Sequence, residues 1–219
     1  MPNQQPQGFL ATPLTGRGPG VLVLHAWWGL NETMKALCGR LAAEGFVTFA
    51  PDLYRGKIAA TIKDAEILTR ELNETQARVD IAEAVRFLSE RADPTGPGLG
   101  VIGFSLGAHF ALGLSLEDPD RVRTVVAFYG TRSEDYRRSK ATYLGHFAET
   151  DDYEPASAVR SLEDALRAAG RPVTFHTYPG TGHWFFEADR SDAYNEAGAR
   201  LAWERTVAFL KRELTQPGG

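Results

Sequence analysis

A serine lies between two glycines at the end of an apolar run, in the sequence Gly103-Phe104-Ser105-Leu106-Gly107. The apolar run predicts a buried strand, and the small residues after the serine predict a helix. A strand that turns abruptly into a helix strains the residue at the junction and presents its side chain at the top of the sheet. Gly103 and Gly107 leave room for the two elements to pack closely. The pattern predicts an exposed nucleophile at Ser105, with an ordinary strand-to-helix turn as the alternative.

A serine nucleophile needs a base, and the base needs a carboxylate. A serine hydroxyl becomes reactive at neutral pH when an imidazole accepts its proton, and a carboxylate fixes the tautomer of that imidazole. His183 follows the last predicted strand in a glycine-flanked loop, and Asp151 and Asp152 follow an earlier strand. We predict that His183 is the base and Asp151 the acid. Asp152 is the alternative, but it lies nearer the helix predicted to begin at Ala156, where a capping side chain is expected.

Two backbone N–H groups are candidates to stabilise the oxyanion that such a serine would generate. The N–H of Leu106 begins the predicted helix, where the helix dipole favours negative charge. Trp27, in the loop after the first parallel strand, supplies the second N–H. The indoles of Trp27 and Trp28 suit either the wall of an apolar pocket or packing at the sheet edge. The other aromatic residues predicted to line the same cleft also follow strand ends: Tyr54, Tyr129 and Trp184.

Short apolar runs alternate with helical patterns along the whole chain. Strands are predicted at 8–12, 21–25, 46–50, 99–104, 122–130, 142–148 and 173–178. Helices are predicted at 30–44, 65–92 (as one or two), after the serine, at 156–169 and at 194–214. This alternation predicts one α/β domain over residues 9–214, with a mostly parallel central sheet and helices on both faces. We expect an antiparallel edge strand at 8–12 with a hairpin through 16–20, and flexible tails at 1–8 and 215–219.

Composition narrows the classes of protein. A chain of 219 residues with 43% hydrophobic residues can build a sizeable core, and its net charge of −4 predicts neither nucleic acid nor a membrane surface as partner. The single cysteine, Cys38, lies on an amphipathic helical pattern and is expected to be buried. No signal peptide or membrane-spanning stretch is visible. We therefore expect a cytoplasmic protein, monomeric or homodimeric.

The sequence gives little support for a metal or phosphate site. It holds no cysteine pair, no H-x-x-x-H spacing, no EF-hand pattern and no P-loop. The histidines outside the predicted triad are expected to be structural: His25, His109, His146 and His176. A basic cluster after the 122–130 strand is expected to be a solvated face, or else to attract an anionic substrate: Arg132, Arg137, Arg138 and Lys140. We expect no cofactor and no metal.

Four segments together resemble the dienelactone hydrolase family in order and spacing. They are HAWWGLN at 25–31, APDLY at 50–54, GFSLG at 103–107 and GH at 182–183. The similarity extends from about Phe9 to the terminal helix. It implies a single-domain α/β-hydrolase without a large lid, which hydrolyses small carboxylic esters or lactones without a cofactor.

The chain departs from the family's pattern at three places. The best-known members carry a cysteine at the position of Ser105 and a glutamate at the position of Ala26. These two changes agree with each other, because a hydroxyl nucleophile has no thiolate to manage. The arginines that bind the substrate carboxylate in the family are not clearly matched, since Glu187 stands four residues after His183 and Arg190 is only a near neighbour. The departures predict a serine esterase that works through an acyl-enzyme. A catalytically silent binding module and an acyltransferase are the alternatives.

Overall fold

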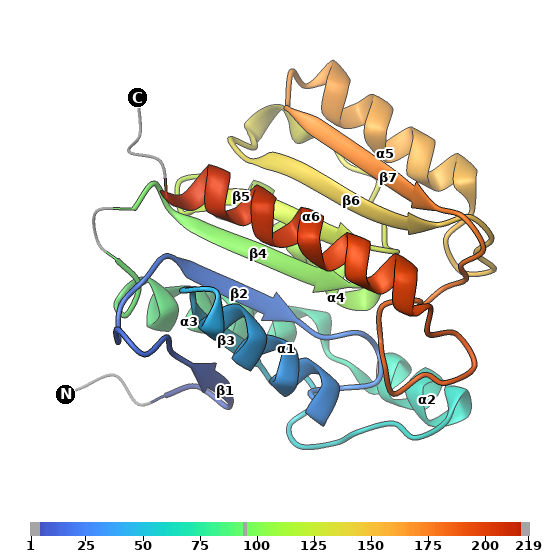
Figure 1. Cartoon of the computed structure of the whole chain (residues 1–219), viewed down its shortest axis with the longest axis horizontal. Coiled ribbons are helices and arrows are strands. Elements are labelled where there is room, and N and C mark those ends of the chain that lie inside the picture. Colours follow the sequence, from blue (N-terminus) through green and yellow to red (C-terminus); the bar gives the residue numbers. More distant parts are fainter. Residues whose placement is uncertain (1–4, 94–95, 216–219) are drawn as a thin grey trace.

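The computed structural model describes residues 5–93 and 96–215, and within them a single seven-stranded sheet in the order β1-β3-β2-β4-β5-β6-β7 (Figure 1). The strands are β1 (Gly8–Ala11), β2 (Gly20–Leu24), β3 (Val47–Pro51), β4 (Leu99–Phe104), β5 (Val122–Phe128), β6 (Thr142–Ala148) and β7 (Val173–Tyr178). The helices are α1 (Glu32–Ala43), α2 (Ile62–Glu71), α3 (Glu74–Ser89), α4 (Leu106–Glu117), α5 (Ala156–Ala168) and α6 (Glu196–Thr215), with a 3₁₀ turn η1 (Tyr136–Arg138). All neighbouring strands are parallel except β1 and β3. The predicted α/β class is confirmed.

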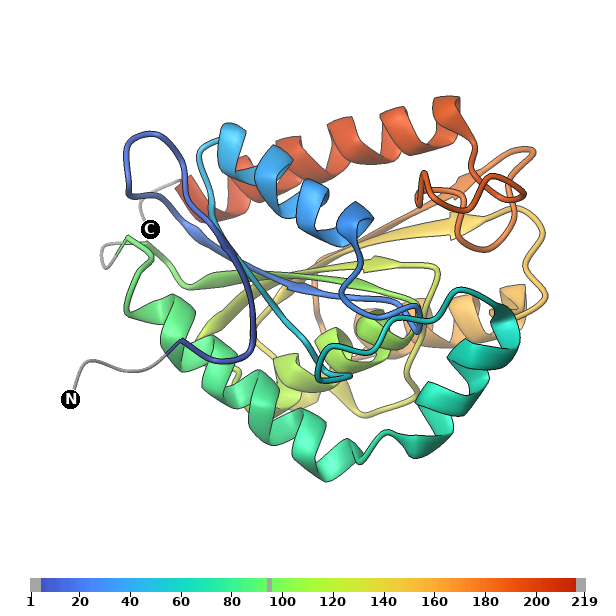
Figure 2. The same cartoon turned by 90° about the horizontal axis from the view of Figure 1, so that it is seen from below.

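The sheet separates two apolar cores. Helices α1 and α6 cover one face, and α3, α4 and α5 cover the other (Figure 2). Along β2, Val21 and Val23 belong to the core that includes α1 and α6, whereas Leu22 and Leu24 belong to the core that includes α3 and α4. Because successive side chains of a strand point to opposite faces, a strand buried on both faces must be apolar throughout. The unbroken apolar runs of the sequence therefore have a direct structural cause.

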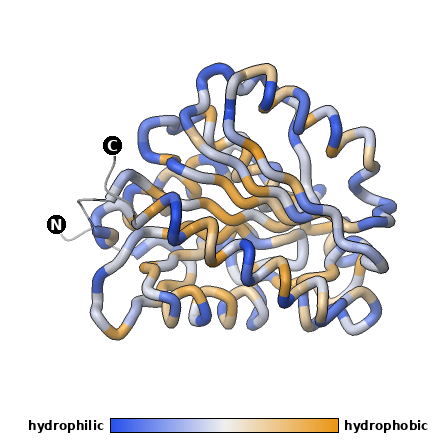
Figure 3. Tube along the Cα trace, turned by 45° about the horizontal axis from the view of Figure 1, so that its top comes forward, coloured by the Kyte–Doolittle hydropathy of each residue, from blue (hydrophilic) through white to orange (hydrophobic). Residues whose placement is uncertain are grey.

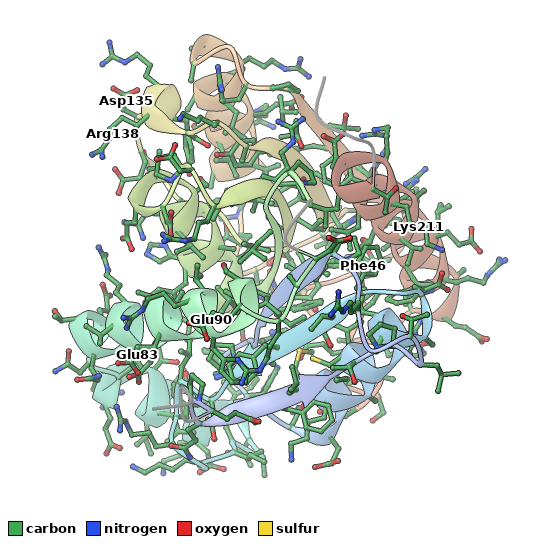
Figure 4. The ribbon with its side chains drawn as sticks, turned by 90° about the vertical axis from the view of Figure 1, so that its left-hand side faces the viewer. Phe46, Glu83, Glu90, Asp135, Arg138 and Lys211 are labelled. Carbon is green, nitrogen blue, oxygen red and sulfur yellow. The ribbon has the colours of Figure 1, made fainter. Side chains whose placement is uncertain are left out.

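Polar residues lie on the outer sides of the helices and on the loops. Figure 3 shows the hydrophobic residues gathered along the central strands and the hydrophilic ones around them. Glu83 and Glu90 project on the α3 side of the sheet, and Lys211 projects on the α6 side (Figure 4). None of the helices in the described part of the chain is long and apolar enough to cross a membrane.

The helix ends follow the capping signals of the sequence. Asn31 caps α1 by accepting a hydrogen bond from the N–H of Met34 at 3.0 Å, and Gly45 follows the helix with φ +100°. The segment 65–92 forms two helices. The second, α3, is capped by Asn73, whose side chain accepts a hydrogen bond from the N–H of Gln76 at 3.0 Å. Of the tails expected at 1–8 and 215–219, residues 1–4 and 216–219 lie outside the described residues, whereas Gly8 begins β1 and Thr215 ends α6.

The first strand does not form the expected hairpin. β1 is an antiparallel edge strand, as predicted, but it pairs with β3 rather than with β2. Both sides of β2 are occupied, by β3 and by β4. The connection from β1 to β2 therefore passes the start of β3, where the carbonyl of Pro19 accepts a hydrogen bond from the N–H of Val47 at 2.9 Å.

Glycine is required where α4 packs on the end of β2. A Cβ atom at Gly107 would overlap the carbonyl oxygen of Leu24, which belongs to the backbone and cannot move aside. We expect Gly107→Ala to lower the free energy of unfolding by about 3 kcal/mol. Gly39→Ala is the matched control, because a Cβ there meets nothing within 4 Å and alanine favours the α1 helix by up to about 1 kcal/mol. Urea unfolding measures both, and equal stability of the two variants would contradict the packing argument.

Candidate active site

The backbone at Ser105 is held in a strained conformation between β4 and α4. Its φ of 48° and ψ of −110° lie outside the regions that side chains normally allow. The N–H of Ser105 donates to the carbonyl of Phe128 at 2.9 Å, and its own carbonyl accepts from Ala108 and His109 in the first turn of α4. These bonds tie the junction to both neighbouring elements. The strand–turn–helix predicted from the sequence is present.

A continuous chain of hydrogen bonds joins Ser105, His183 and Asp151. His183 Nε2 lies 3.0 Å from Ser105 Oγ, and His183 Nδ1 lies 2.7 Å from Asp151 Oδ2. An ionised carboxylate can only accept, so Nδ1 donates and Nε2 carries the lone pair that faces the serine hydroxyl. The side chains of His183 and Asp151 are only 4% and 5% exposed. This is the tautomer and the arrangement that a general base for Ser105 requires.

In the turn after β6, it is Asp151 and not Asp152 that lies against His183 Nδ1. Asp151 Oδ1 accepts from the backbone N–H groups of Tyr153 and Glu154, both at 2.9 Å. Asp152 is exposed, and the residue that caps α5 is Pro155, without a side-chain hydrogen bond. The expectation that Asp152 would serve as the helix cap is therefore wrong. The polar N–H groups of this turn are satisfied by Asp151 itself.

Strained backbone conformations are concentrated around the hydrogen-bonded residues Ser105, His183 and Asp151. Within the described residues, the residues other than glycine with positive φ are Arg55, Ser105, Tyr129 and Trp184. Ser105 follows β4, Tyr129 (φ 35°) follows β5, and Trp184 (φ 64°) follows His183 directly. Left-handed backbone is costly for bulky side chains and persists where the surroundings enforce it, most often at functional sites.

Aromatic rings surround His183. The Tyr129 ring lies 4.9 Å from the imidazole, and the Trp184 ring 5.0 Å from it. Trp27 stacks on Trp184 at 5.7 Å, and Trp28 packs edge-on against both indoles. The structure thus brings together four of the five aromatic residues that the sequence assigned to the cleft.

Tyr54 is the exception. Its ring packs against His25 at 5.2 Å, and its hydroxyl lies 3.0 Å from Thr69 Oγ1 in α2. It lines a cavity of about 200 Å³ between the loop after β3 and the helices α2 and α3. Because β2 lies between β3 and β4, the loop after β3 is one strand removed from Ser105. None of these contacts brings Tyr54 to the triad.

The backbone N–H groups of the two predicted oxyanion donors are unpaired in the described part of the chain. Leu106 is the first residue of α4, and Trp27 lies in the loop that follows β2, the neighbour of β4. Neither backbone N–H has an acceptor among the described residues. Unpaired N–H groups at a helix start and in an adjacent loop are what an oxyanion hole requires.

The sequence gives no indication of the buried acid Glu187, which lies against Tyr129. Glu187 is fully buried, and one of its carboxyl oxygens accepts from the Tyr129 hydroxyl at 2.8 Å. The other oxygen has no partner among the described residues. Burial, with the nearby charge of Asp189, raises the pKa of Glu187 to about 8. Arg190 lies over the Trp28 ring at 4.1 Å and is paired with Asp189 at 3.0 Å.

The remaining histidines have structural partners. His25 bonds to the backbone at both ring nitrogens, at Ala26 and Leu53, and burial lowers its pKa. His146 bonds to the hydroxyls of Tyr178 and Thr206. Members of the basic cluster after β5 pair with nearby acids: Arg132 with Glu134, Arg137 with Asp135, and Lys140 with Asp120. Within the described ranges, no three His, Cys, Asp or Glu side chains come close enough to hold a metal ion.

Comparison with known proteins decides the family. The sequence pattern of the dienelactone hydrolase family matches residues 7–214. The chain belongs to the dienelactone hydrolase family. It is a carboxylic ester hydrolase with the α/β-hydrolase fold.

Relatives of similar length match nearly the whole chain. A protein of Aquifex pyrophilus named usf is 36% identical over 95% of this chain and 94% of its own length. A protein of Aquifex aeolicus that bears the name carboxymethylenebutenolidase is 31% identical, with the same coverage. The structure named as a dienelactone hydrolase from Klebsiella pneumoniae superposes with a TM-score of 0.81, at 25% identity, over 93% of this chain and 91% of that one.

The buried Glu187 predicts a pH dependence of stability in this hydrolase. Its pKa is about 8 in the folded chain, against an ordinary value of 4.5, so the folded state holds the proton more tightly than the unfolded state. The free energy of unfolding should therefore fall as pH rises from about 4.5 to about 8, by about 1.4 kcal/mol per pH unit. Glu187→Gln removes this slope, and its amide oxygen still accepts from Tyr129. Urea unfolding between pH 5.5 and 8.5 compares the two proteins, and identical pH profiles would rule out the buried acid as the cause.

Proposed function

We propose that this chain is a serine esterase that hydrolyses small carboxylic esters or lactones through an acyl-enzyme on Ser105. The observation that carries the proposal is the hydrogen bond between His183 Nε2 and Ser105 Oγ, with Asp151 holding the other ring nitrogen. Membership of the dienelactone hydrolase family supports the ester or lactone substrate. A relative from Bradyrhizobium, 29% identical, carries the name of a lactonase.

In the first half of the reaction, Ser105 Oγ attacks the carbonyl carbon and passes its proton to His183 Nε2. The N–H groups of Leu106 and Trp27 donate to the oxyanion of the tetrahedral intermediate. The intermediate then collapses as the bond to the leaving oxygen breaks. That oxygen takes the proton from Nε2, and the acyl group stays on Ser105. With a lactone, the released hydroxyl remains attached to the acyl group.

In the second half, water replaces the alcohol. It gives a proton to His183 Nε2 and attacks the acyl carbon, and the second intermediate collapses with cleavage of the bond to Ser105 Oγ. Oγ recovers the proton, and the carboxylic acid leaves. Throughout, Asp151 stabilises the imidazolium that forms twice in each turnover. No cofactor enters any step.

The nucleophile is tested by Ser105→Ala. Removing the hydroxyl removes covalent catalysis, so kcat for p-nitrophenyl acetate or butyrate should fall by at least about 10³-fold. A fluorophosphonate probe should label the wild-type chain at Ser105 and leave Ser105→Ala unlabelled. Hydrolysis at the wild-type rate by Ser105→Ala would exclude this serine. A folded wild-type chain that neither labels nor hydrolyses esters would instead be a catalytically silent binding module.

The acid is tested by a matched pair of neighbouring aspartates. Asp151→Asn removes the charge and disturbs the tautomer of His183, so kcat should fall by about 10³- to 10⁴-fold. Asp152→Asn changes the same charge one residue away, on an exposed side chain, and should leave kcat within about twofold. Steady-state kinetics with p-nitrophenyl acetate distinguish the two, and equal losses in both variants would reject Asp151 as the orienting acid.

A further inference from the structure

Tyr153 lies over the candidate active site on the solvent side. Its ring is 5.0 Å from the imidazole of His183, 4.9 Å from the ring of Trp184 and 5.5 Å from that of Trp27. The residue is 45% exposed, whereas His183 and Trp184 are each 6% exposed. Tyr153 is therefore the outermost ring of the group, with one side on the triad and the other in water.

The backbone of Tyr153 is fixed while the end of its side chain is not. Its N–H donates to Asp151 Oδ1 at 2.9 Å, so the turn that holds the acid also positions this ring. The next residue, Glu154, accepts a hydrogen bond from Thr131 Oγ1 at 2.7 Å and anchors the turn to the loop after β5. The Tyr153 hydroxyl has no hydrogen-bond partner in the described part of the chain.

The chemistry of the triad fixes which part of an ester meets this ring. The leaving oxygen must take its proton from His183 Nε2, so the alcohol part of the substrate has to lie on the histidine side of Ser105. Tyr153 is the exposed ring on that side; the half-buried ring of Trp27 packs against it, and the buried ring of Trp184 supports it. Aromatic rings pack favourably on one another at these distances.

We propose that Tyr153 is a specificity-determining residue for the alcohol part of the ester, and that it favours esters of aromatic alcohols. The proposal rests on the proposed esterase function. It assigns the ring, and not the hydroxyl, as the selecting group. It also assigns selection to substrate binding and not to the chemical step, because the aromatic ring itself takes no part in proton transfer.

The test compares acetates whose alcohols have similar acidity but different size. The rates of hydrolysis of benzyl acetate and ethyl acetate are to be measured for the wild-type chain and for Tyr153→Ala, Tyr153→Leu and Tyr153→Phe. A pH-stat follows the release of acid. Tyr153→Ala should lower kcat/KM for benzyl acetate about tenfold through KM, and change that for ethyl acetate by less than about twofold. Tyr153→Phe should behave as the wild type, and Tyr153→Leu should fall between them.

Two controls separate the ring from general effects. Tyr194→Ala removes another partly exposed tyrosine, 39% exposed, in a hollow between α1 and α6, and should leave the benzyl-to-ethyl ratio unchanged. The ratio between p-nitrophenyl butyrate and acetate varies only the acyl part, and Tyr153→Ala should not alter it. The thermal midpoint of each variant reports whether the fold is retained.

Three results would overturn the proposal. If Tyr153→Ala lost the same kcat/KM on benzyl and ethyl acetate, the ring would only cover the site. If kcat/KM did not change on either ester, Tyr153 would have no role in selection. A change confined to the ratio of butyrate to acetate would place the ring against the acyl part of the ester. Each leaves hydrolysis that depends on Ser105 intact. Failure of the wild-type chain to hydrolyse any ester, together with no fluorophosphonate labelling of Ser105, would reject the esterase function and this proposal with it.

Discussion

The backbone of Ser105 can stay in its strained conformation only because β4 lies at the centre of the sheet. A left-handed φ at a serine costs on the order of 1–3 kcal/mol, and the neighbouring strand and helix must hold it in place. The hydrogen bond to Phe128 and the close approach of Gly103 and Gly107 do so. The order β4-β5-β6-β7 then brings the loops that carry Asp151 and His183 to the same edge of the sheet. Parallel pairing is thus what allows residues 32 and 78 positions apart to share hydrogen bonds.

Burial strengthens the hydrogen bonds that join Ser105, His183 and Asp151, and it also disfavours the charged form of Glu187. Aromatic rings enclose His183, so its bonds to Asp151 and Ser105 are screened by little water and retain most of their strength. The same enclosure leaves Glu187 in an apolar setting, where its charged form is disfavoured. The Tyr129 hydroxyl satisfies only one of its oxygens. The site therefore combines an imidazole held against Ser105 with a carboxyl group that is expected to lower the free energy of unfolding as pH rises toward about 8.

Local sequence patterns were sufficient for most of the fold, and they singled out Ser105, Asp151 and His183, which the structure brings within hydrogen-bond distance of one another. Apolar runs and turns identify strands buried on both faces. Residues with reactive side chains at the strand ends come together because the carboxyl ends of parallel strands lie at the same edge of the sheet. The partner of β1 was not predictable, since a strand's own pattern does not say which neighbour has a free edge. Tyr54 follows a strand end too, but its strand lies beyond β2. Tyr153 and Glu187 stand in loops where no local pattern indicates their contacts, and only the folded loops bring Tyr153 onto His183 and bury Glu187 against Tyr129.

The central claim is that Ser105 forms a covalent acyl-enzyme, and trapping it is the most direct test. The wild-type chain is mixed with p-nitrophenyl butyrate, quenched in acid within milliseconds, digested and measured by mass spectrometry. The account predicts a butyryl group on the peptide that contains Ser105, formed together with a burst of up to one p-nitrophenol per chain when deacylation is the slower half. Turnover with no acylated peptide at any quench time, or with the acyl group on another residue, would contradict it.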